Sequence, residues 1–319
     1  MAKPKVFISE PIHQKGLELL DDNVEIVEAP DTSKKTALTL IGDCQAAILR
    51  ATTQFDADVI NAARNLRIIA RTGVGYNNVD LEAASHRGIY VTLTPGANTT
   101  TVAEHVLTMI LALGKQLFFM DSAVRQGRWE DRFSDFQMDI AGKVVGIIGL
   151  GAIGKEVARL CNGLSMQVLV YDPFIDDFFE GKRTDNLQDI FKESDFVTLH
   201  CPVLPATRHL VNREYLSLMK TTAYLINSSR GALINESDLV EALQDQRIRG
   251  AALDVFENEP LHRDHPLALL PNVILSPHCA GSTVESNERI AVMAAQAVLD
   301  TLEGKRPKHI CNEDKIAAL

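Results

Sequence analysis

Gly149-Leu150-Gly151-Ala152-Ile153-Gly154, in the middle of the chain, has the spacing of a glycine-rich turn between a strand and a helix. The apolar run Val144 to Ile148 precedes this turn, a helical pattern follows it, and a second apolar run ends at Tyr171. The first glycine permits the sharp turn, the second lets the backbone approach a pyrophosphate, and the third lets the helix pack closely on the strand. The stretch therefore predicts a Rossmann unit that binds a dinucleotide at a helix N-terminus.

Asp172 follows directly after that second apolar run. Its carboxylate can accept hydrogen bonds from both ribose hydroxyls of NAD, and it would repel the 2′-phosphate of NADP. Pro173 and Phe174 come next, so no arginine stands there to receive that phosphate. The sequence therefore predicts NAD rather than NADP as the cofactor.

Length and composition are those of an ordinary globular protein, with 319 residues, 46% hydrophobic content and room for two domains. A net charge of −10 and a sequence pI near 5.4 argue against nucleic acid or anionic membrane as partners. The first apolar run is too short for a signal peptide, and no apolar stretch approaches a membrane span, so we expect a cytoplasmic protein. The five cysteines are scattered and form no CxxC pair, which indicates neither a disulfide framework nor a thiolate metal site.

Short apolar runs alternate with amphipathic segments along most of the chain, which predicts an α/β fold with two doubly wound parallel sheets. Five runs precede the glycine-rich turn: Val6–Ile8, Val24–Val27, Ala46–Leu49, Leu66–Ala70 and Ile89–Val91. Four more follow its second strand: Phe196–Leu199, Ala223–Ile226, Gly250–Leu253 and Val273–Leu275. The apolar spacing from Thr99 to about Gln126 predicts one long helix, either an interdomain strut or a core helix. A closing helical pattern, from Ile290 to Leu302, is expected to pack back on the first domain.

Unusual polar residues follow the last three of these runs, where ligands bind in doubly wound folds. Arg230, Glu259 and His278 lie in these segments. Taken singly, each has an ordinary explanation: Arg230 as a surface charge, Glu259 as a solvated loop carboxylate and His278 as a buried turn residue. Together they suit hydride transfer to a 2-oxo acid: His278 donates the proton, Glu259 orients the imidazole and favours its protonated form, and Arg230 binds the carboxylate and the carbonyl oxygen.

The chain resembles the D-isomer-specific 2-hydroxyacid dehydrogenases over essentially its whole length. The matching stretches are Arg71–Asp80, Thr94–Asn98, Val102–His105, the Gly149 turn, His200–Pro202 and the segments around Arg230, Glu259 and His278. The resemblance implies a flavodoxin-like substrate domain, residues 1–100 plus 288–319, into which a Rossmann NAD-binding domain, residues 101–287, is inserted. It also implies a homodimer formed through the second domain.

The same resemblance assigns roles to individual residues. It implies that Arg230, Glu259 and His278 are catalytic and that the backbone amides of Val74 and Gly75 hold the substrate carboxylate in a cleft between the domains. The cofactor is expected to contact Gly149, Gly151, Ala152, Ile153, Gly154, Asp172, Cys201, Ser228, Asp254 and Gly281. His200 is placed beside the adenosine half of the cofactor, and His262 and His265 are interpreted as residues of a solvated loop rather than metal ligands, so no metal is expected.

The physiological 2-oxo acid stays open at this point. The stretch Leu49–Thr53 and Arg71 look most like phosphoglycerate dehydrogenases, in which case Arg50 and Arg71 bind a distal phosphate. Alternatively the two arginines only support their loop, and the chain is a hydroxypyruvate or glyoxylate reductase, which fits its length equally well. A third hypothesis, from another class, is an NADH-sensing protein that resembles the transcriptional corepressors with this fold.

Overall fold

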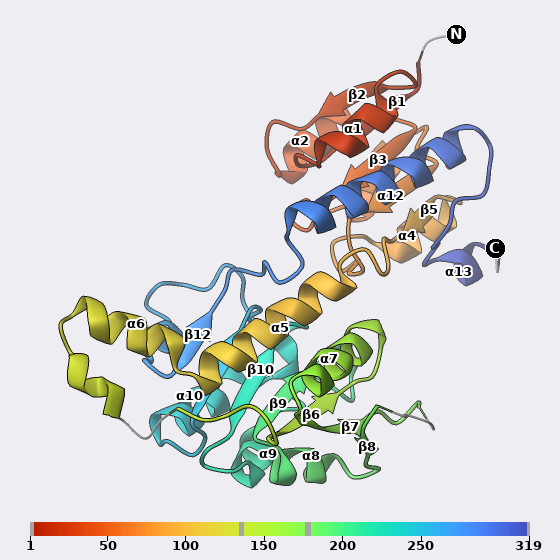
Figure 1. Ribbon diagram of the computed structural model, residues 1–319. Coiled ribbons are helices and arrows are strands. Elements are labelled where there is room, and N and C mark those ends of the chain that lie inside the picture. The colour runs from red at the N-terminus through yellow and green to blue at the C-terminus, as the bar shows by residue number, and fades with distance from the viewer. Residues whose placement is uncertain (1–2, 134–136, 176–179, 318–319) are drawn as a thin grey trace. The chain divides into compact units, whose positions relative to one another are not determined.

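The computed structural model describes residues 3–133, 137–175 and 180–317. The chain divides into two compact units. Unit 1 consists of Met1–Asn98 and Ser282–Leu319, and unit 2 is the continuous segment Thr99–Gly281. Unit 2 is thus inserted in sequence between the two segments of unit 1, and each unit contains its own parallel sheet (Figure 1).

Unit 1 contains a five-stranded parallel sheet in the order β2-β1-β3-β4-β5, which is the flavodoxin-like order. The strands are β1 (Lys5–Ile8), β2 (Glu25–Glu28), β3 (Ala46–Leu49), β4 (Ile68–Arg71) and β5 (Tyr90–Thr92). The helices are α1 (Gln14–Leu20), α2 (Lys34–Leu40), α3 (Ala57–Ala62), α4 (Leu81–His86), α12 (Val284–Leu302) and α13 (Glu313–Ala317).

Both faces of this sheet are covered, because alternate residues along each strand enter different clusters of the core. Phe7 packs with residues of α2, α3 and α4, whereas Val6 and Ile8 pack with residues of α1 and α12. α1 and α12 lie side by side, and a Cβ at Gly16 would lie 2.8 Å from the Cβ of Ala291 (Figure 1). The closing helix α12 therefore packs on the first sheet, although it is separated from that sheet in sequence by all of unit 2.

Unit 2 contains a seven-stranded parallel sheet in the order β12-β11-β10-β9-β6-β7-β8. The strands are β6 (Val144–Ile148), β7 (Gln167–Tyr171), β8 (Lys182–Arg183), β9 (Phe196–Leu199), β10 (Tyr224–Asn227), β11 (Gly250–Leu253) and β12 (Val273–Leu275). The α-helices are α5 (Thr99–Gly114), α6 (Leu117–Arg125), α7 (Ala152–Gly163), α8 (Leu187–Glu193), α9 (Arg213–Leu218), α10 (Glu236–Gln244) and α11 (Pro266–Leu269), and the 3-10 helices are η1 (Trp129–Phe133) and η2 (Gly231–Leu233). The order is that of a Rossmann sheet extended by one strand, so the predicted fold class is confirmed.

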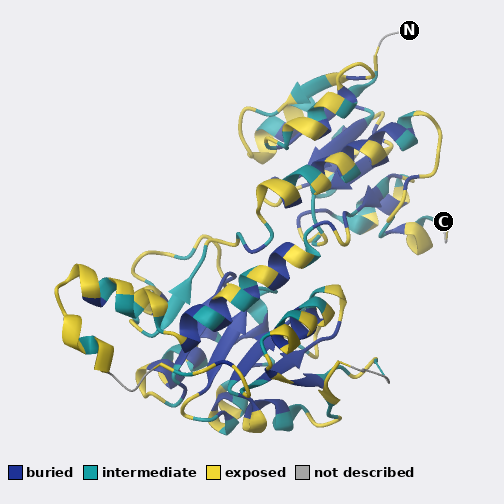
Figure 2. Cartoon of the chain, in the orientation of Figure 1, coloured by how far each residue is buried: buried dark blue, intermediate teal, exposed yellow. Residues whose placement is uncertain are grey.

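The inner strands of both sheets are buried almost throughout, whereas the edge strands β2, β8 and β12 are partly exposed (Figure 2). This explains why they read as continuous apolar runs rather than as alternating ones, as expected for parallel sheets covered on both faces. It also explains why the runs were recognisable from the sequence within a residue or two of their observed ends.

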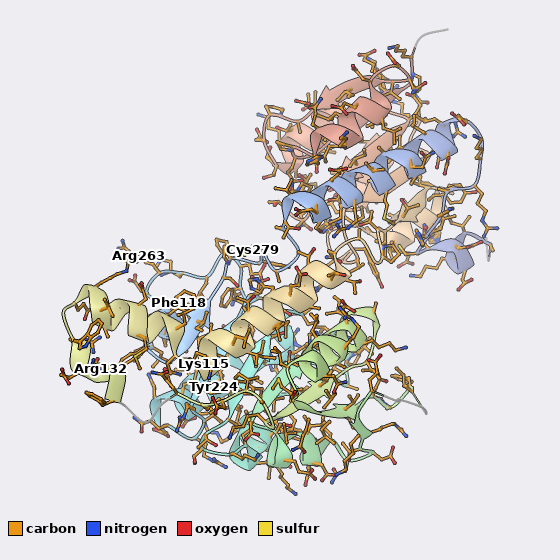
Figure 3. All side chains as sticks on the ribbon, viewed as in Figure 1. Lys115, Phe118, Arg132, Tyr224, Arg263 and Cys279 are labelled. Carbon is orange, nitrogen blue, oxygen red and sulfur yellow. The ribbon has the colours of Figure 1, made fainter. Side chains whose placement is uncertain are left out.

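The prediction of one continuous helix from Thr99 to about Gln126 was wrong. α5 ends at Gly114 and α6 begins at Leu117, with the two axes bent by 56°. Between them Gln116 adopts a left-handed conformation, with φ 52°, and its side-chain amide donates to the Leu113 carbonyl and to the Tyr224 hydroxyl, each at 2.9 Å (Tyr224 is labelled in Figure 3). Apolar spacing continues across this break, so periodicity alone did not reveal it. Of the described residues, no single helix is long and apolar enough to cross a membrane.

Candidate active site

The glycine-rich turn joins β6 to α7, and each of its glycines has a distinct environment. Gly149 has a φ of 94°, and a Cβ there would lie 2.7 Å from the Cys201 amide nitrogen. A Cβ at Gly154 would lie 2.2 Å from the Gly149 carbonyl oxygen, so only glycine allows α7 to approach the turn this closely. Nothing lies within 4 Å of a Cβ at Gly151. The turn therefore leaves open space beside its second glycine, which suits a backbone that a pyrophosphate approaches.

The N-terminus of α7 faces this turn. Gly151 is the N-cap, and no side chain caps the helix there. The first-turn amides, which include those of Ala152 and Ile153, lack acceptors within the helix and carry the positive end of its dipole. These residues fit the pyrophosphate of a dinucleotide.

Asp172, after β7, is held against the same turn. One of its oxygens accepts from the Leu150 amide at 2.7 Å and the other from the Phe174 amide at 2.9 Å. These bonds fix the orientation of the carboxylate at the strand end while leaving further lone pairs on both oxygens. These remaining positions suit an acceptor of hydrogen bonds from a ribose diol.

Strand register aligns the ends of β6, β9, β10, β11 and β12. The aligned residues are, in that order, Ile148, Leu199, Asn227, Leu253 and Leu275. Because all five strands are parallel, the segments that follow them leave the sheet at the same edge. The glycine-rich turn and the segments carrying Arg230, Glu259 and His278 therefore begin at one edge of unit 2.

His278 and Glu259 form the closest pair among the predicted catalytic residues. His278 Nδ1 lies 2.7 Å from Glu259 Oε2, and the other oxygen of Glu259 accepts from the Phe256 amide at 3.0 Å. With Nδ1 engaged by the carboxylate, Nε2 is the ring nitrogen left to exchange a proton with a substrate. The His278 side chain is 49% exposed, which leaves the ring accessible.

The conformation of His278 is set by its own loop. The residue has a φ of 51°, and its amide donates to the carbonyl oxygens of Asp254 and Ser276 at 2.8 and 3.1 Å. Cys279, the next residue, is labelled in Figure 3. A non-glycine residue in this left-handed region is unfavourable by itself, so surrounding bonds must hold it there.

Arg230 follows β10 on a turn that the Asn227 side chain supports by donating to the Arg230 carbonyl at 2.8 Å. Its guanidinium is partly buried and donates to the Ser229 carbonyl at 2.6 Å. Burial lowers the pKa of Arg230, and the negative charge of Glu259 opposes that change. The group remains a cation at neutral pH because arginine starts from so high a pKa, so it is suited to binding a carboxylate.

Asp254 is fully buried and holds the His278 loop. Its carboxylate accepts from the Ser276 hydroxyl at 2.6 Å and from the amides of Cys279 and Ala280 at 2.9 and 2.8 Å. Ser276 in turn lies 3.1 Å from His105 Nε2. Asp254, a predicted cofactor contact, thus bonds through its carboxylate to the loop around His278. The sequence analysis did not predict that Ser276 and His105 take part in this network. The only indication in the sequence was that both residues lie in stretches that match the family.

Two further predicted cofactor residues lie at the same strand edge. The amide of Cys201 abuts Gly149, and burial raises the pKa of the Cys201 thiol to about 11, so the thiol is neutral. The Ser228 hydroxyl is buried and has no hydrogen-bond partner within the described part of the chain. A buried hydroxyl without a partner is unfavourable, and a polar group of a bound cofactor would satisfy it.

His200 is not a suitable acid at this edge. Burial lowers its pKa to about 4, and its Nε2 lies 3.0 Å from the Thr198 hydroxyl. The ring is therefore neutral at physiological pH. His262 is also peripheral: its side chain is 77% exposed, and residues 3–133, 137–175 and 180–317 contain no group of three or more His, Cys, Asp or Glu that could hold a metal ion.

In unit 1, Arg71 is 8% exposed and bonded to its own loop. Its Nε donates to Asn78 Oδ1 at 3.0 Å, and its Nη1 donates to the Thr72 carbonyl at 2.6 Å. Asn78 donates in turn to the carbonyls of Arg50 and Thr53 at 2.9 and 2.8 Å. The Arg50 guanidinium is on the surface, with Nη1 2.9 Å from the Pro11 carbonyl.

The loop after Arg71 carries the two residues whose amides are expected to hold a substrate carboxylate. Gly73 has a φ of 130°, and its amide donates to the Thr94 hydroxyl at 2.8 Å. Val74 is 40% exposed although it is apolar. The loop is thus anchored at Arg71 and Gly73 and presents Val74 and Gly75 beyond those anchors.

Residues 107–280 match the family model described as D-isomer specific 2-hydroxyacid dehydrogenase, NAD binding domain. The matched segment lies within unit 2 and contains the glycine-rich turn, Arg230, Glu259 and His278.

Similar proteins extend the match to nearly the whole chain. A glyoxylate reductase of Korarchaeum cryptofilum is 38% identical, over 98% of this chain and 97% of the relative. A D-3-phosphoglycerate dehydrogenase of Methanocaldococcus jannaschii is 35% identical over 98% of this chain, which corresponds to 60% of that longer relative. Among solved structures, the TT0316 protein of Thermus thermophilus has a TM-score of 0.90 and 34% identity, covering 96% of this chain and 99% of the other.

Proposed function

Since the chain belongs to the D-isomer-specific 2-hydroxyacid dehydrogenase family, and is therefore an NAD-dependent oxidoreductase, we propose that Arg230, Glu259 and His278 are its catalytic residues. The observation that carries this proposal is the 2.7 Å contact between His278 Nδ1 and Glu259 at the strand edge that also bears the glycine-rich turn. A histidine oriented by a carboxylate at this place is suited to exchange a proton during hydride transfer.

The proposed chemistry is the interconversion of a 2-oxo acid and a D-2-hydroxy acid. Bound NADH supplies the hydride that reaches C2 of the oxo acid. His278 Nε2 gives its proton to the carbonyl oxygen as negative charge develops there, and Glu259 keeps the ring oriented through Nδ1. Arg230 binds the substrate carboxylate and stabilises the developing charge on the oxygen. In the oxidative direction the neutral His278 takes the proton of the hydroxyl.

The environments described above support a set of cofactor roles. We propose that Gly149, Gly151 and Gly154 shape the turn for the pyrophosphate, that Ala152 and Ile153 donate to it, and that Asp172 accepts from the ribose. Cys201, Ser228, Asp254 and Gly281 are proposed to line the rest of the cofactor. Unit 1 is proposed to bind the substrate, with the amides of Val74 and Gly75 donating to its carboxylate.

We propose a small 2-oxo acid, such as glyoxylate or hydroxypyruvate, as the substrate. The buried guanidinium of Arg71 supports this choice, because its bonds to Asn78 and Thr72 are ones a distal phosphate would have to replace. The guanidinium of Arg50, which is only partly buried, is the observation that favours the alternative, a phosphoglycerate dehydrogenase. Initial rates of NADH oxidation with glyoxylate, hydroxypyruvate and phosphohydroxypyruvate separate the two. A strong preference for the phosphorylated acid would contradict our choice.

A sensor of the NADH level, which resembles the corepressors with this fold, is the alternative from another class. It requires cofactor binding without turnover. Fluorescence titration with NADH, performed beside the rate assay, distinguishes them: tight NADH binding together with no oxidation in the presence of any 2-oxo acid would favour the sensor.

We propose that the protein is a homodimer and that α6 and η1 contribute to the contact. Five large apolar side chains on these elements are more than half exposed, namely Leu117, Phe118, Val124, Trp129 and Phe133 (Phe118 is labelled in Figure 3). Such a cluster is unfavourable in water and typical of an interface. Light scattering after size-exclusion chromatography should give twice the mass of the chain, and Phe118→Asp should lower the measured mass.

We also propose a cytoplasmic location, which the free thiols of all five cysteines support.

A further inference from the structure

A buried carboxylate outside the proposed catalytic residues bonds to the loop that carries Glu259. Glu236, the first residue of α10, is 8% exposed, and its Oε1 accepts a hydrogen bond from the Glu257 amide at 2.6 Å. Burying a carboxylate is costly unless hydrogen bonds compensate it. The hydrogen bond from the Glu257 amide offsets part of this cost, and the presence of a buried carboxylate at this position indicates a structural or functional role.

The hydrogen bond between Glu236 and the Glu257 amide lies directly beside the hydrogen bond that orients Glu259. The Phe256 amide donates to Glu259 Oε1 at 3.0 Å, and the following amide, of Glu257, donates to Glu236. Two consecutive amides thus connect Glu236 to Glu259 through a single short piece of backbone. A displacement of that backbone would move the Glu259 carboxylate relative to His278.

The same backbone is confined on a second side. A Cβ at Gly231, the residue after Arg230, would lie 1.9 Å from the carbonyl carbon of Phe256. The turn that carries Arg230 therefore abuts the peptide that Glu236 holds. The Phe256–Glu257 peptide is therefore held between Gly231 and Glu236. Its position sets the spacing of Arg230 and Glu259.

Capping of the helix does not account for Glu236. The N-cap of α10 is Asn235, whose side chain accepts from the Asp238 amide at 3.2 Å, so the helix has its own cap. The Glu236 carboxylate points to the loop instead of to its own helix.

The surroundings of Glu236 are strongly charged. Burial raises the pKa of Glu236, the hydrogen bond from the Glu257 amide and the nearby His265 lower it, and the carboxylates of Glu257 and Glu259 raise it. His265 Nε2 lies 3.5 Å from Glu236 Oε2, and Glu257 pairs with His209. Three carboxylates thus gather around the loop.

We propose that Glu236 is a positioning residue, which acts through the Phe256–Glu259 loop to hold the Glu259 carboxylate against His278. The inference rests on the proposed function, because it assumes that Glu259 and His278 take part in catalysis. Glu236 itself touches neither substrate nor cofactor in this scheme. Its effect is on the rate of the chemical step rather than on the binding of NADH.

Three variants of Glu236 test the proposal. Glu236→Ala removes the acceptor, and Glu236→Asp keeps the charge but withdraws it by one methylene. Each should lower kcat by about 10-fold or more, since displacements of about 1 Å have such effects on catalysis. Glu236→Gln keeps an oxygen acceptor in place and should restore most of the rate. Glu241→Ala, an exposed change on the same helix, is the matched control and should leave kcat unchanged.

The readouts separate positioning from a loss of structure. The Kd for NADH, from fluorescence titration of each variant, should stay within about 2-fold of the parent value, because the glycine-rich turn is untouched. Melting temperatures identify variants that are damaged as a whole, and the aspartate variant supplies the result if the alanine variant does not fold. Equal kcat in the parent, Glu236→Ala and Glu236→Asp proteins would overturn the proposal.

A double-mutant cycle with Glu259→Gln tests the route of the effect. If Glu236 acts through Glu259, Glu236→Ala should cost about 10-fold in the parent and less than about 2-fold in the Glu259→Gln background. An equal loss in both backgrounds would contradict the proposal. A His278→Gln variant with full activity would instead contradict the proposed function, so the two failures are distinguishable.

Discussion

Asp254→Asn should disrupt the loop that carries His278, and its cost follows from the three hydrogen bonds that the carboxylate accepts. Oδ1 accepts from the Ser276 hydroxyl and the Cys279 amide, and Oδ2 accepts from the Ala280 amide. In the asparagine variant one of these positions becomes an NH2 group, which cannot accept a hydrogen bond. If the oxygen keeps the Oδ1 position, the Ala280 amide, which is buried, faces another donor.

The expected magnitude is the loss of one hydrogen bond to a charged acceptor, about 1.5–3 kcal/mol, and the cost of leaving a buried amide unsatisfied, about 1–3 kcal/mol. Partial relaxation of the loop reduces their sum, so we expect a destabilisation of about 2–4 kcal/mol. The left-handed conformation of His278 depends on the same loop, so kcat should fall with stability, by about 10-fold or more.

The assay compares melting temperature, kcat and the Kd for NADH in the parent, Asp254→Asn and Asp245→Asn. Asp245 is exposed at the end of α10, so its substitution is the same chemical change without buried partners. An unchanged melting temperature together with an unchanged kcat in Asp254→Asn would refute the assignment of this carboxylate to the loop. A large rise in the Kd for NADH with normal stability would instead show that the proposed contact of Asp254 with the cofactor outweighs its support of the loop.

Three further changes test other parts of the account. Arg71→Ala should lower the melting temperature by several degrees, because a buried guanidinium and its hydrogen bonds to the loop are lost. A large rise in KM for the oxo acid without a change in melting temperature would instead indicate that Arg71 binds the substrate. Asp172→Ala should raise the ratio of kcat/KM for NADPH to that for NADH by about 10-fold, and an unchanged ratio would count against ribose recognition by Asp172. His200, with its pKa lowered to about 4, should contribute its full stability above the unfolded pKa near 6.5 and progressively less as the pH falls toward 4. The free energy of unfolding of the parent should therefore fall relative to that of His200→Gln over this range, and a difference that does not change with pH would contradict this.

Much of the fold was predictable because parallel strands buried on both faces appear as short apolar runs. The strands from β1 to β7 and from β9 to β12 all correspond to such runs, whereas β8, the two-residue strand Lys182–Arg183, carries no apolar signal at all. The break between α5 and α6 was not predictable from periodicity, since it depends on a single left-handed residue, Gln116, and on its distant partner Tyr224.

The composition of the candidate site was recognisable, but its internal bonds were not. Residue types and their position after strand ends indicated Arg230, Glu259 and His278 together. The identity of a residue does not tell whether its side chain faces a ligand or its own loop, which is why the environments of Asp254 and Arg71 required the structure. The anchoring of the Glu259 loop by Glu236 depends on a contact between α10 and the segment after β11, which lie apart in sequence.

The most direct test of the account is a comparison of His278→Gln with the parent protein in a single-turnover experiment, in which bound NADH is mixed with a saturating small 2-oxo acid. We predict that the variant binds NADH with a Kd within about 2-fold of the parent value, while the rate of NADH oxidation falls by about 100-fold or more, because the proton donor has been removed. An oxidation rate equal to that of the parent would contradict the assignment of His278, and with it the proposed mechanism.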